Sequence, residues 1–243
     1  MNGRRIAEML WATTRLAIHA RDPRIRARCL LALEHPEGLF QPEATTAPDR
    51  YPVLFRFVRE RLGDTPECRI LSFGCSTGEE VFSLRSYFPR ARIKGLDIDR
   101  RKIAECRKRL LSRGGDEGLD FETRGSAAIE PASLYDAIFA MAVFRHGALG
   151  SSPPRCDHLI RFLDFETSVA ELARCLKPGG LLVLRHANFR FSDTRASRGF
   201  RPIFQAPPHQ DGAGAPIYGP DDRLAPHSVG DDGVFEKHTS DAA

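Results

Sequence analysis

The feature that most constrains the fold is an alternation between short apolar segments and amphipathic segments across residues 69–186. Apolar stretches of strand length occur at residues 69–73, 93–96, 119–123, 137–143 and 181–186, and helical spacing occurs at residues 78–87, 100–112 and 163–176. This order predicts an α/β fold, a doubly wound and mostly parallel sheet with helices on both faces. Because such sheets bind ligands at the carboxyl ends of their strands, we expect the functional residues there.

The two ends of the chain differ in charge from this central region. Residues 1–30 hold seven arginines against two acidic residues, whereas residues 206–243 hold seven acidic residues against one arginine and one lysine. We predict a basic helical extension and linker over residues 1–48, an α/β domain over residues 49–205 and an acidic, proline- and glycine-rich tail over residues 206–243. The opposite charges either draw the tail back over the body or steer an anionic partner to the N-terminal end.

Local patterns predict how these end segments fold. Apolar positions at three- and four-residue steps predict one helix over residues 6–20 and a second over residues 24–34. Residues 35–52 form a linker or a covering loop, in which Asp49 is expected to cap the following helix. Within the tail, only Val234–Lys237 has the pattern of a strand, and it is a candidate for the last, antiparallel strand of the sheet.

Composition excludes several classes of protein and leaves a cytoplasmic one favoured. The six cysteines form no C-x-x-C pair and no cysteine–histidine spacing typical of a zinc site, so no metal is predicted and reduced thiols are expected. No segment approaches the roughly 18 apolar residues that a membrane span needs. The arginine-rich N-terminus lacks an aromatic-rich binding motif, so a nucleic-acid partner is left open but is not indicated.

A glycine-containing loop follows the first predicted strand, in the run Ser72-Phe73-Gly74-Cys75-Ser76-Thr77-Gly78-Glu79-Glu80. Gly74 lets the chain turn sharply out of the strand, and Gly78 lets the next helix begin close to the sheet, as in loops that bind nucleotide-type ligands. Dinucleotide enzymes have a small residue where Glu79 stands, and a pyrophosphate would meet its carboxylate. A sulfonium amino acid with a free ammonium group is instead attracted by acidic residues at this place.

The run from Ser72 to Glu80 resembles motif I of class I S-adenosylmethionine-dependent methyltransferases, and specifically the G-C-S-T-G-E-E version found in chemotaxis-receptor methyltransferases. The likeness to the wider class extends from about residue 50 to residue 190. It implies a Rossmann-like sheet of the class I type and S-adenosyl-L-methionine as the cofactor. It further implies that the cofactor contacts Phe73, Gly74, Cys75, Ser76 and Gly78, with Glu79 near its ammonium group.

The resemblance implies further cofactor contacts downstream. Asp97 and Ile98 end the second predicted strand, and in this class the acidic residue there accepts hydrogen bonds from both ribose hydroxyls. The alternative is that Asp97 caps the next helix, a role for which Asp99 is the better candidate. Ser126 stands where the class presents a polar residue to the adenine amino group, and Ala142 lies at the cofactor-facing end of the fourth strand.

The same strand end is where the class places groups that contact the methyl acceptor. Arg145 is a candidate contact for an anion, and His146 is a candidate general base. The alternative is that His146 caps the strand and Arg145 pairs with an acid such as Asp136. Residues 188–191 and Tyr218 either line the acceptor pocket or serve only in packing.

The implied reaction is direct displacement, in which a nucleophilic atom of the acceptor attacks the methyl carbon and S-adenosylhomocysteine leaves. A small-molecule acceptor is favoured over a protein carboxylate or RNA. One rival is a non-catalytic Rossmann-like module that binds the cofactor or a partner, and its sign would be a blocked or absent cavity beside residues 143–146. A nicotinamide oxidoreductase is a further rival, disfavoured by Glu79.

Overall fold

The computed structural model describes residues 10, 13–15, 17–18, 21–34, 36, 38–42, 46–207 and 215–239. Most of the helix predicted over residues 6–20 therefore lies outside the described residues. The second N-terminal helix, α2 (Pro23–Glu34), begins one residue before its predicted start. Within the described ranges, no helix is both long enough and apolar enough to cross a lipid bilayer.

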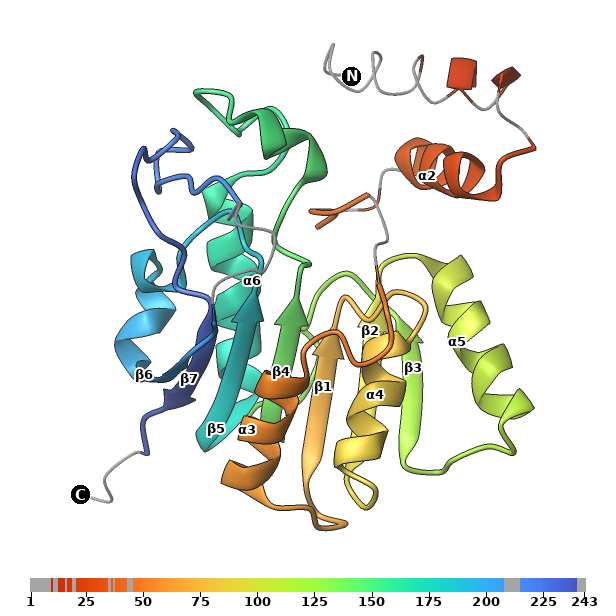
Figure 1. Ribbon diagram of the computed structural model, residues 1–243, viewed down its shortest axis with the longest axis vertical. Coiled ribbons are helices and arrows are strands. Elements are labelled where there is room, and N and C mark those ends of the chain that lie inside the picture. The colour runs from red at the N-terminus through yellow and green to blue at the C-terminus, as the bar shows by residue number, and fades with distance from the viewer. Residues whose placement is uncertain are drawn as a thin grey trace.

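A seven-stranded sheet forms the centre of the molecule (Figure 1). Its strands are β1 (Arg69–Phe73), β2 (Arg92–Asp97), β3 (Leu119–Thr123), β4 (Tyr135–Met141), β5 (Leu176–Arg185), β6 (Phe200–Gln205) and β7 (Gly233–Lys237). They lie in the order β3-β2-β1-β4-β5-β7-β6, in which the first five are parallel and β7 is antiparallel to both of its neighbours. The prediction of a doubly wound, mostly parallel sheet is confirmed. The strand order reverses between β1 and β4, where sheets of this kind bind ligands.

Helices cover both faces of the sheet (Figure 1). The helices α3 (Pro52–Leu62), α4 (Glu79–Tyr87) and α5 (Arg100–Ser112) pack on one face, and α6 (Phe162–Cys175) packs on the other. Consecutive strand residues face opposite sides of the sheet. Ile70 therefore packs in the core under α3, α4 and α5, and Leu71 packs in the core under α6. Burial on both faces fixes the register of the parallel strands and brings their carboxyl ends to one edge of the sheet.

Several details differ from the sequence-based prediction, including β4, which covers residues 135–141 rather than residues 137–143. The strand β6 was not expected, because it contains Pro202 and lies at the exposed edge of the sheet, where the apolar pattern is weak. The strand β5 begins at Leu176, five residues before the predicted start at Leu181. Asp49 does not cap α3: Tyr51 is the N-cap residue, without a capping side-chain bond, and the Asp49 carboxylate accepts a hydrogen bond from the hydroxyl of Tyr87.

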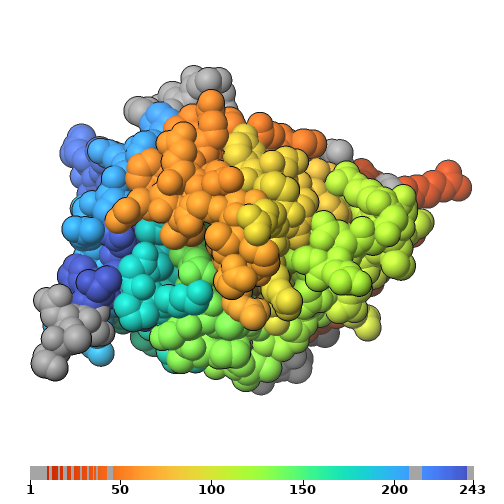
Figure 2. Space-filling model, turned by 90° about the horizontal axis from the view of Figure 1, so that it is seen from below, coloured from red at the N-terminus to blue at the C-terminus, as the bar shows by residue number. Residues whose placement is uncertain are grey.

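Residues 215–239 of the acidic tail pack against the body. The predicted strand is β7 and is antiparallel, but it lies inside the sheet between β5 and β6. Glu236 of β7 accepts a hydrogen bond from Arg61 of α3, and Tyr218 is fully buried with its hydroxyl bonded to the carbonyl oxygen of Pro153. From below, α3 (orange) lies between α4 (yellow) and the blue C-terminal segments (Figure 2). The tail thus returns to the body, one of the two outcomes expected from its charge.

Candidate functional site

A cavity opens at the carboxyl ends of β1, β2 and β4, where the strand order reverses. Of the residues predicted to bind the cofactor, its lining includes Phe73, Gly74, Cys75, Ser76, Asp97, Ile98 and Ala142. The other predicted site residues, Gly78, Glu79, Ser126, Arg145 and His146, are not among its lining residues. The cavity thus brings together residues from three separate strand ends.

The loop between β1 and α4 has a backbone geometry that requires its glycines. Gly74 has a φ of 77°, and a Cβ atom there would lie 2.6 Å from Cγ2 of Val143. Gly78 has a φ of 84° as the N-cap of α4, and a Cβ atom there would lie 3.0 Å from Sγ of Cys106. The Gly74 N–H donates to the carbonyl oxygen of Leu96 at 2.8 Å, which ties the loop to β2. The loop is therefore held close to the sheet on one wall of the cavity.

Asp97 ends β2 on the adjoining wall and is 5% exposed. One carboxylate oxygen accepts the Ser76 N–H at 2.7 Å, and the other accepts the Asp99 N–H at 2.8 Å. Burial raises the pKa of the Asp97 carboxyl, while the charge of Lys102 and these two bonds act in the opposite direction. Each oxygen keeps a lone pair for a ligand donor. The helix cap on α5 is Asp99, which accepts the Arg101 N–H, so the capping alternative for Asp97 is wrong.

Two consecutive glutamates at the start of α4 have different surroundings. The carboxylate of Glu79 lies 2.8 Å from the guanidinium of Arg109 and does not line the cavity. Glu80 lines the cavity, accepts a hydrogen bond from the Ser72 hydroxyl at 2.7 Å, and has its pKa raised by burial to about 7. Glu80 was not singled out from the sequence. Ser83, three residues further along α4, lines the same cavity, so the two polar side chains share one face of the helix.

The segment before α3 covers one side of the cavity. Residues 38–41, residues 46–47 and Arg50 all line it. The ring of Phe40 is buried and lies 5.1 Å from the ring of Phe144 in an edge-to-face contact, which attaches the segment to the body. This region, expected to be a linker or a covering loop, therefore covers the candidate site.

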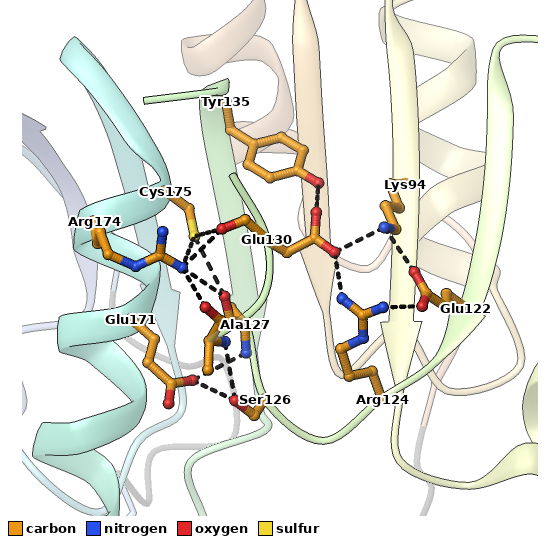
Figure 3. Close-up of polar contacts among 11 residues, drawn as sticks. Lys94, Glu122, Arg124, Ser126, Ala127, Glu130, Tyr135, Glu171, Arg174 and Cys175 are labelled. Carbon is orange, nitrogen blue, oxygen red and sulfur yellow. Dashed lines mark hydrogen bonds and ion pairs between the residues drawn. The ribbon is translucent and has the colours of Figure 1, made fainter. Parts of the chain in front are cut away.

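A network of charged side chains supports the wall that follows β3 (Figure 3). The Nζ atom of Lys94 lies 2.7 Å from carboxylate oxygens of both Glu122 and Glu130. Arg124, which lines the cavity, pairs with the same two glutamates, and the hydroxyl of Tyr135 donates to Glu130. The bond from Lys94 lowers the pKa of the Glu122 carboxyl. These paired charges hold the Arg124 side chain in one orientation beside the cavity.

Ser126, predicted to contact adenine, does not line the cavity, and its hydroxyl has partners within the protein. Its hydroxyl donates to Oε2 of Glu171 at 2.7 Å and accepts the Ala128 N–H at 3.0 Å (Figure 3). The preceding residue, Gly125, does line the cavity. An adenine contact from the Ser126 side chain stays a prediction.

Comparison with known proteins finds a family model that matches the central part of the chain. Residues 71–182, which run from β1 into β5, match the family model described as a methyltransferase domain. This part of the chain is similar to methyltransferase domains. The resemblance of motif I to S-adenosylmethionine-dependent methyltransferases is thereby confirmed at the level of the family.

The chain is also similar to curated proteins. It is 30% identical over 118 residues to a trans-aconitate 2-methyltransferase from Methylobacterium nodulans, covering 48% of this chain and 37% of that protein. It is 29% identical over 129 residues to the ubiquinone/menaquinone biosynthesis C-methyltransferase UbiE from Desulfotalea psychrophila. This match covers 53% of this chain and 45% of that protein. Among solved structures, a geranyl diphosphate C-methyltransferase from Streptomyces coelicolor A3(2) matches this chain with a TM-score of 0.42 and 16% sequence identity. The match covers 55% of this chain and 43% of that protein. The chain spans less than half the length of the curated relatives it matches.

The residues predicted to contact the acceptor, Arg145 and His146, lie just beyond the end of β4. The Nε atom of Arg145 is buried and has no hydrogen-bond partner among the described residues. The proposed pairing of Arg145 with Asp136 is wrong, because Asp136 lies near the start of β4 and binds Lys177 at 2.7 Å. Nδ1 of His146 accepts the Ala148 N–H at 3.3 Å, which caps the short 3-10 helix η1 (Gly147–Ser151). His146 therefore has a capping role on the helix, while its role as a base stays a prediction.

The segment after β5 packs against the body. Asn188 accepts the His146 N–H at 2.8 Å, and Arg190 pairs with Asp193 at 2.9 Å. Phe189 and Phe191 are each 1% exposed within the core. Residues 188–191 therefore serve in packing, the second of the two alternatives expected from the sequence.

Backbone strain gathers at this end of the sheet. Ser76, Ala142 and His186 are not glycines, yet they have φ values of 52°, 59° and 59° in the loops that follow β1, β4 and β5. Such conformations cost about 1 to 3 kcal/mol each and persist only where surrounding bonds hold them. The Ala142 N–H donates to the Arg185 carbonyl oxygen at 2.8 Å, and the His186 N–H donates to Asp232 at 3.0 Å. Strain held at one end of the sheet is typical of ligand-binding sites.

The described residues contain neither a disulfide nor a cluster of metal ligands. All six cysteines are buried, and none of them forms a disulfide bond. Among the described residues, no group of three or more histidine, cysteine, aspartate and glutamate side chains could hold a metal ion.

Proposed function

We propose that this protein transfers a methyl group from S-adenosylmethionine to a small-molecule acceptor by direct displacement. The observation that carries this proposal is the convergence of the motif I loop, Asp97 and Glu80 on one cavity at the reversal point of the sheet. The family match over residues 71–182 supports the same activity.

The polar groups of the cavity suit the two ends of this cofactor. Asp97 would accept hydrogen bonds from the ribose hydroxyls, because both of its oxygens keep a free lone pair. Glu80 would face the ammonium group of the methionine part. A cation beside a carboxyl with a pKa of about 7 stabilises its ionised form, so we expect cofactor affinity to fall as the pH drops below 7.

In the proposed reaction, an oxygen, nitrogen or sulfur of the acceptor attacks the methyl carbon. The bond between carbon and sulfur breaks, its electron pair stays on sulfur, and S-adenosylhomocysteine leaves. Because the methyl group is already activated, the protein contributes mainly alignment, which is worth roughly 7 to 11 kcal/mol when the reacting atoms are held in line.

Two observations favour a small acceptor over the alternatives. Of three curated relatives, two have names that refer to small molecules, trans-aconitate and ubiquinone or menaquinone, and the third, matched over only 76 residues, is named as a ribosomal RNA methyltransferase. The segment before α3 also covers one side of the cavity, which restricts access for a large partner. A non-catalytic module would have a blocked cavity beside residues 143–146, whereas the cavity here reaches Val143.

The proposal extends to the organisation and location of the chain. The catalytic unit would include residues 215–239 as well as residues 49–205, because β7 lies between β5 and β6. A cytoplasmic location is supported by the six unpaired, buried cysteines.

Calorimetric titration with S-adenosylmethionine, S-adenosylhomocysteine and NAD tests the proposed activity. We expect micromolar binding of the first two compounds and none of NAD. Binding of NAD alone would favour an oxidoreductase. If neither S-adenosylmethionine nor S-adenosylhomocysteine binds, the proposed methyltransferase activity is contradicted.

A further inference from the structure

A second group of polar side chains lies next to the cofactor end of the cavity, and the cofactor does not account for it. Tyr51 lines the cavity from the covering segment, and Arg145 follows the end of β4. The hydroxyl oxygen of Tyr51 and the Nε atom of Arg145 are both buried without a hydrogen-bond partner among the described residues. Buried donors in native proteins are nearly always paired, so two unpaired donors close to one cavity point to a missing acceptor atom.

The position of Tyr51 connects these donors to the ends of β4 and β5. Its ring lies 5.6 Å from the ring of His186, which follows β5. The guanidinium of Arg50 lies 5.3 Å from the centre of the same ring, on the cavity lining. Ala142 and Val143 also line the cavity at the end of β4, where the methyl group of the cofactor is expected. The Tyr51 hydroxyl is therefore placed on the acceptor side of the cavity.

The charges around Tyr51 are mainly positive. Arg50, Arg145 and Arg185 all lie close enough for their charges to lower the pKa of its phenol. Burial outweighs them and raises that pKa to about 12, so Tyr51 remains a protonated donor at neutral pH. The nearby acidic groups offset the arginines only in part: Asp232 pairs with Arg185 at 3.5 Å, whereas burial raises the pKa of Glu80 to about 7.

We infer that the methyl acceptor carries an anionic group, a carboxylate or a phosphate, that binds between the Tyr51 hydroxyl and the Arg145 guanidinium. This inference rests on the proposed methyl transfer and names the class of its substrate. An anion accepts hydrogen bonds from both unpaired donors and is attracted by the surrounding arginines, whereas a neutral acceptor would leave the excess positive charge in place.

A bromide soak locates such a site even while the acceptor is unidentified. Crystals of the full chain with S-adenosylhomocysteine are soaked in sodium bromide, and the anomalous signal of bromine gives the positions of bound anions. We expect a bromide ion in contact with both the Tyr51 hydroxyl and the Arg145 guanidinium. Its absence from this position in the wild-type crystals would overturn the inference.

Three variants separate binding from folding. Tyr51→Phe and Arg145→Gln should lose the bromide, whereas Arg198→Gln, which removes an exposed arginine, should retain it. Tyr51→Phe removes a hydroxyl that has no partner among the described residues, so its melting temperature should be unchanged or higher. A lower melting temperature with bromide still bound would show a structural role for the hydroxyl and contradict the inference.

Transfer of a labelled methyl group identifies the source of the charge. A panel of carboxylic acids, phosphate monoesters and the matched amides and alcohols is offered with S-adenosylmethionine. We expect at least tenfold faster transfer to charged members, with the preferred class distinguishing carboxylate from phosphate. Transfer to neutral members alone would contradict the inference. If S-adenosylhomocysteine does not bind, the proposed methyl transfer is contradicted. The bromide position still decides whether an anion site exists.

Discussion

The cofactor end and the acceptor end of the cavity are built in different ways. The cofactor end comes from one continuous stretch, from β1 through the motif I loop to Asp97, and it relies on glycines and backbone N–H groups. The acceptor end gathers Tyr51, Arg145 and Arg185 from distant parts of the chain. A continuous backbone site keeps a recognisable sequence pattern, whereas a dispersed side-chain site is specific to each chain. Four substitutions test the backbone geometry and the side-chain contacts described for the cofactor end.

Gly74→Ala should have the largest effect. The added Cβ would lie 2.6 Å from Cγ2 of Val143, at a residue with a φ of 77°. We expect a loss of about 2 to 4 kcal/mol in the free energy of unfolding, measured by urea denaturation, together with loss of cofactor binding. Gly115→Ala is the matched control, since Gly115 has a φ of 79° but a Cβ atom there would meet no atom within 4 Å, so it should show only the smaller backbone cost. Equal losses in the two variants would contradict a packed motif I loop.

Asp97→Asn should have the next largest effect, on binding. The amide removes the charge and one of the two acceptor oxygens that remain open to the ribose hydroxyls. We expect roughly 10- to 100-fold weaker binding of S-adenosylhomocysteine by calorimetry, because hydrogen bonds to charged groups are worth about 1.5 to 3 kcal/mol. Asp120→Asn alters an exposed carboxylate on β3 and should bind normally. Unchanged affinity in Asp97→Asn would place the ribose elsewhere.

Glu80→Gln should change the pH dependence of both stability and binding. Its folded pKa of about 7 lies above the usual 4.5, so the unliganded wild type is favoured when this group is protonated and loses that stability as the pH rises from about 5 to 8. The variant should avoid this loss, worth about 1 to 3 kcal/mol, and its cofactor affinity should no longer fall below pH 7. Glu79→Gln, in which the carboxylate paired with Arg109 is changed, should keep the wild-type pH profile. The reverse result would assign the ammonium contact to Glu79.

Ser126→Ala should have the smallest effect on binding. The hydroxyl is bonded to Glu171, so its removal should lower the free energy of unfolding by about 1 kcal/mol and leave cofactor affinity within about twofold. Calorimetry and urea denaturation measure the two quantities separately. A large loss of affinity with unchanged stability would show that Ser126 turns toward the adenine when the cofactor is bound.

The difference between the two ends also explains what the sequence could predict. The glycines of motif I and the acid that ends β2 follow from local backbone requirements, so the cavity-lining positions of Gly74 and Asp97 could be anticipated. Which of two adjacent glutamates faces the cavity depends on the rotation of α4, and a step of one residue turns the side chain by about 100°. Local pattern cannot resolve that step, and it did not single out Glu80.

The acceptor end could not be predicted because it depends on tertiary contacts. Tyr51 reaches the cavity only because the covering segment folds back over the sheet. His146 has a capping bond that becomes visible only once η1 is known. The edge strand β6 escaped prediction for a related reason, since its pairing with β7 outweighs the weak strand pattern around Pro202.

A crystal structure with S-adenosylhomocysteine tests the central claim most directly. We predict density in the cavity with both ribose hydroxyls on Asp97, the amino group beside Glu80 and the sulfur directed toward Val143 and Tyr51. Density that lies outside this cavity, or a ribose that makes no contact with Asp97, would contradict the assignment of the cofactor end.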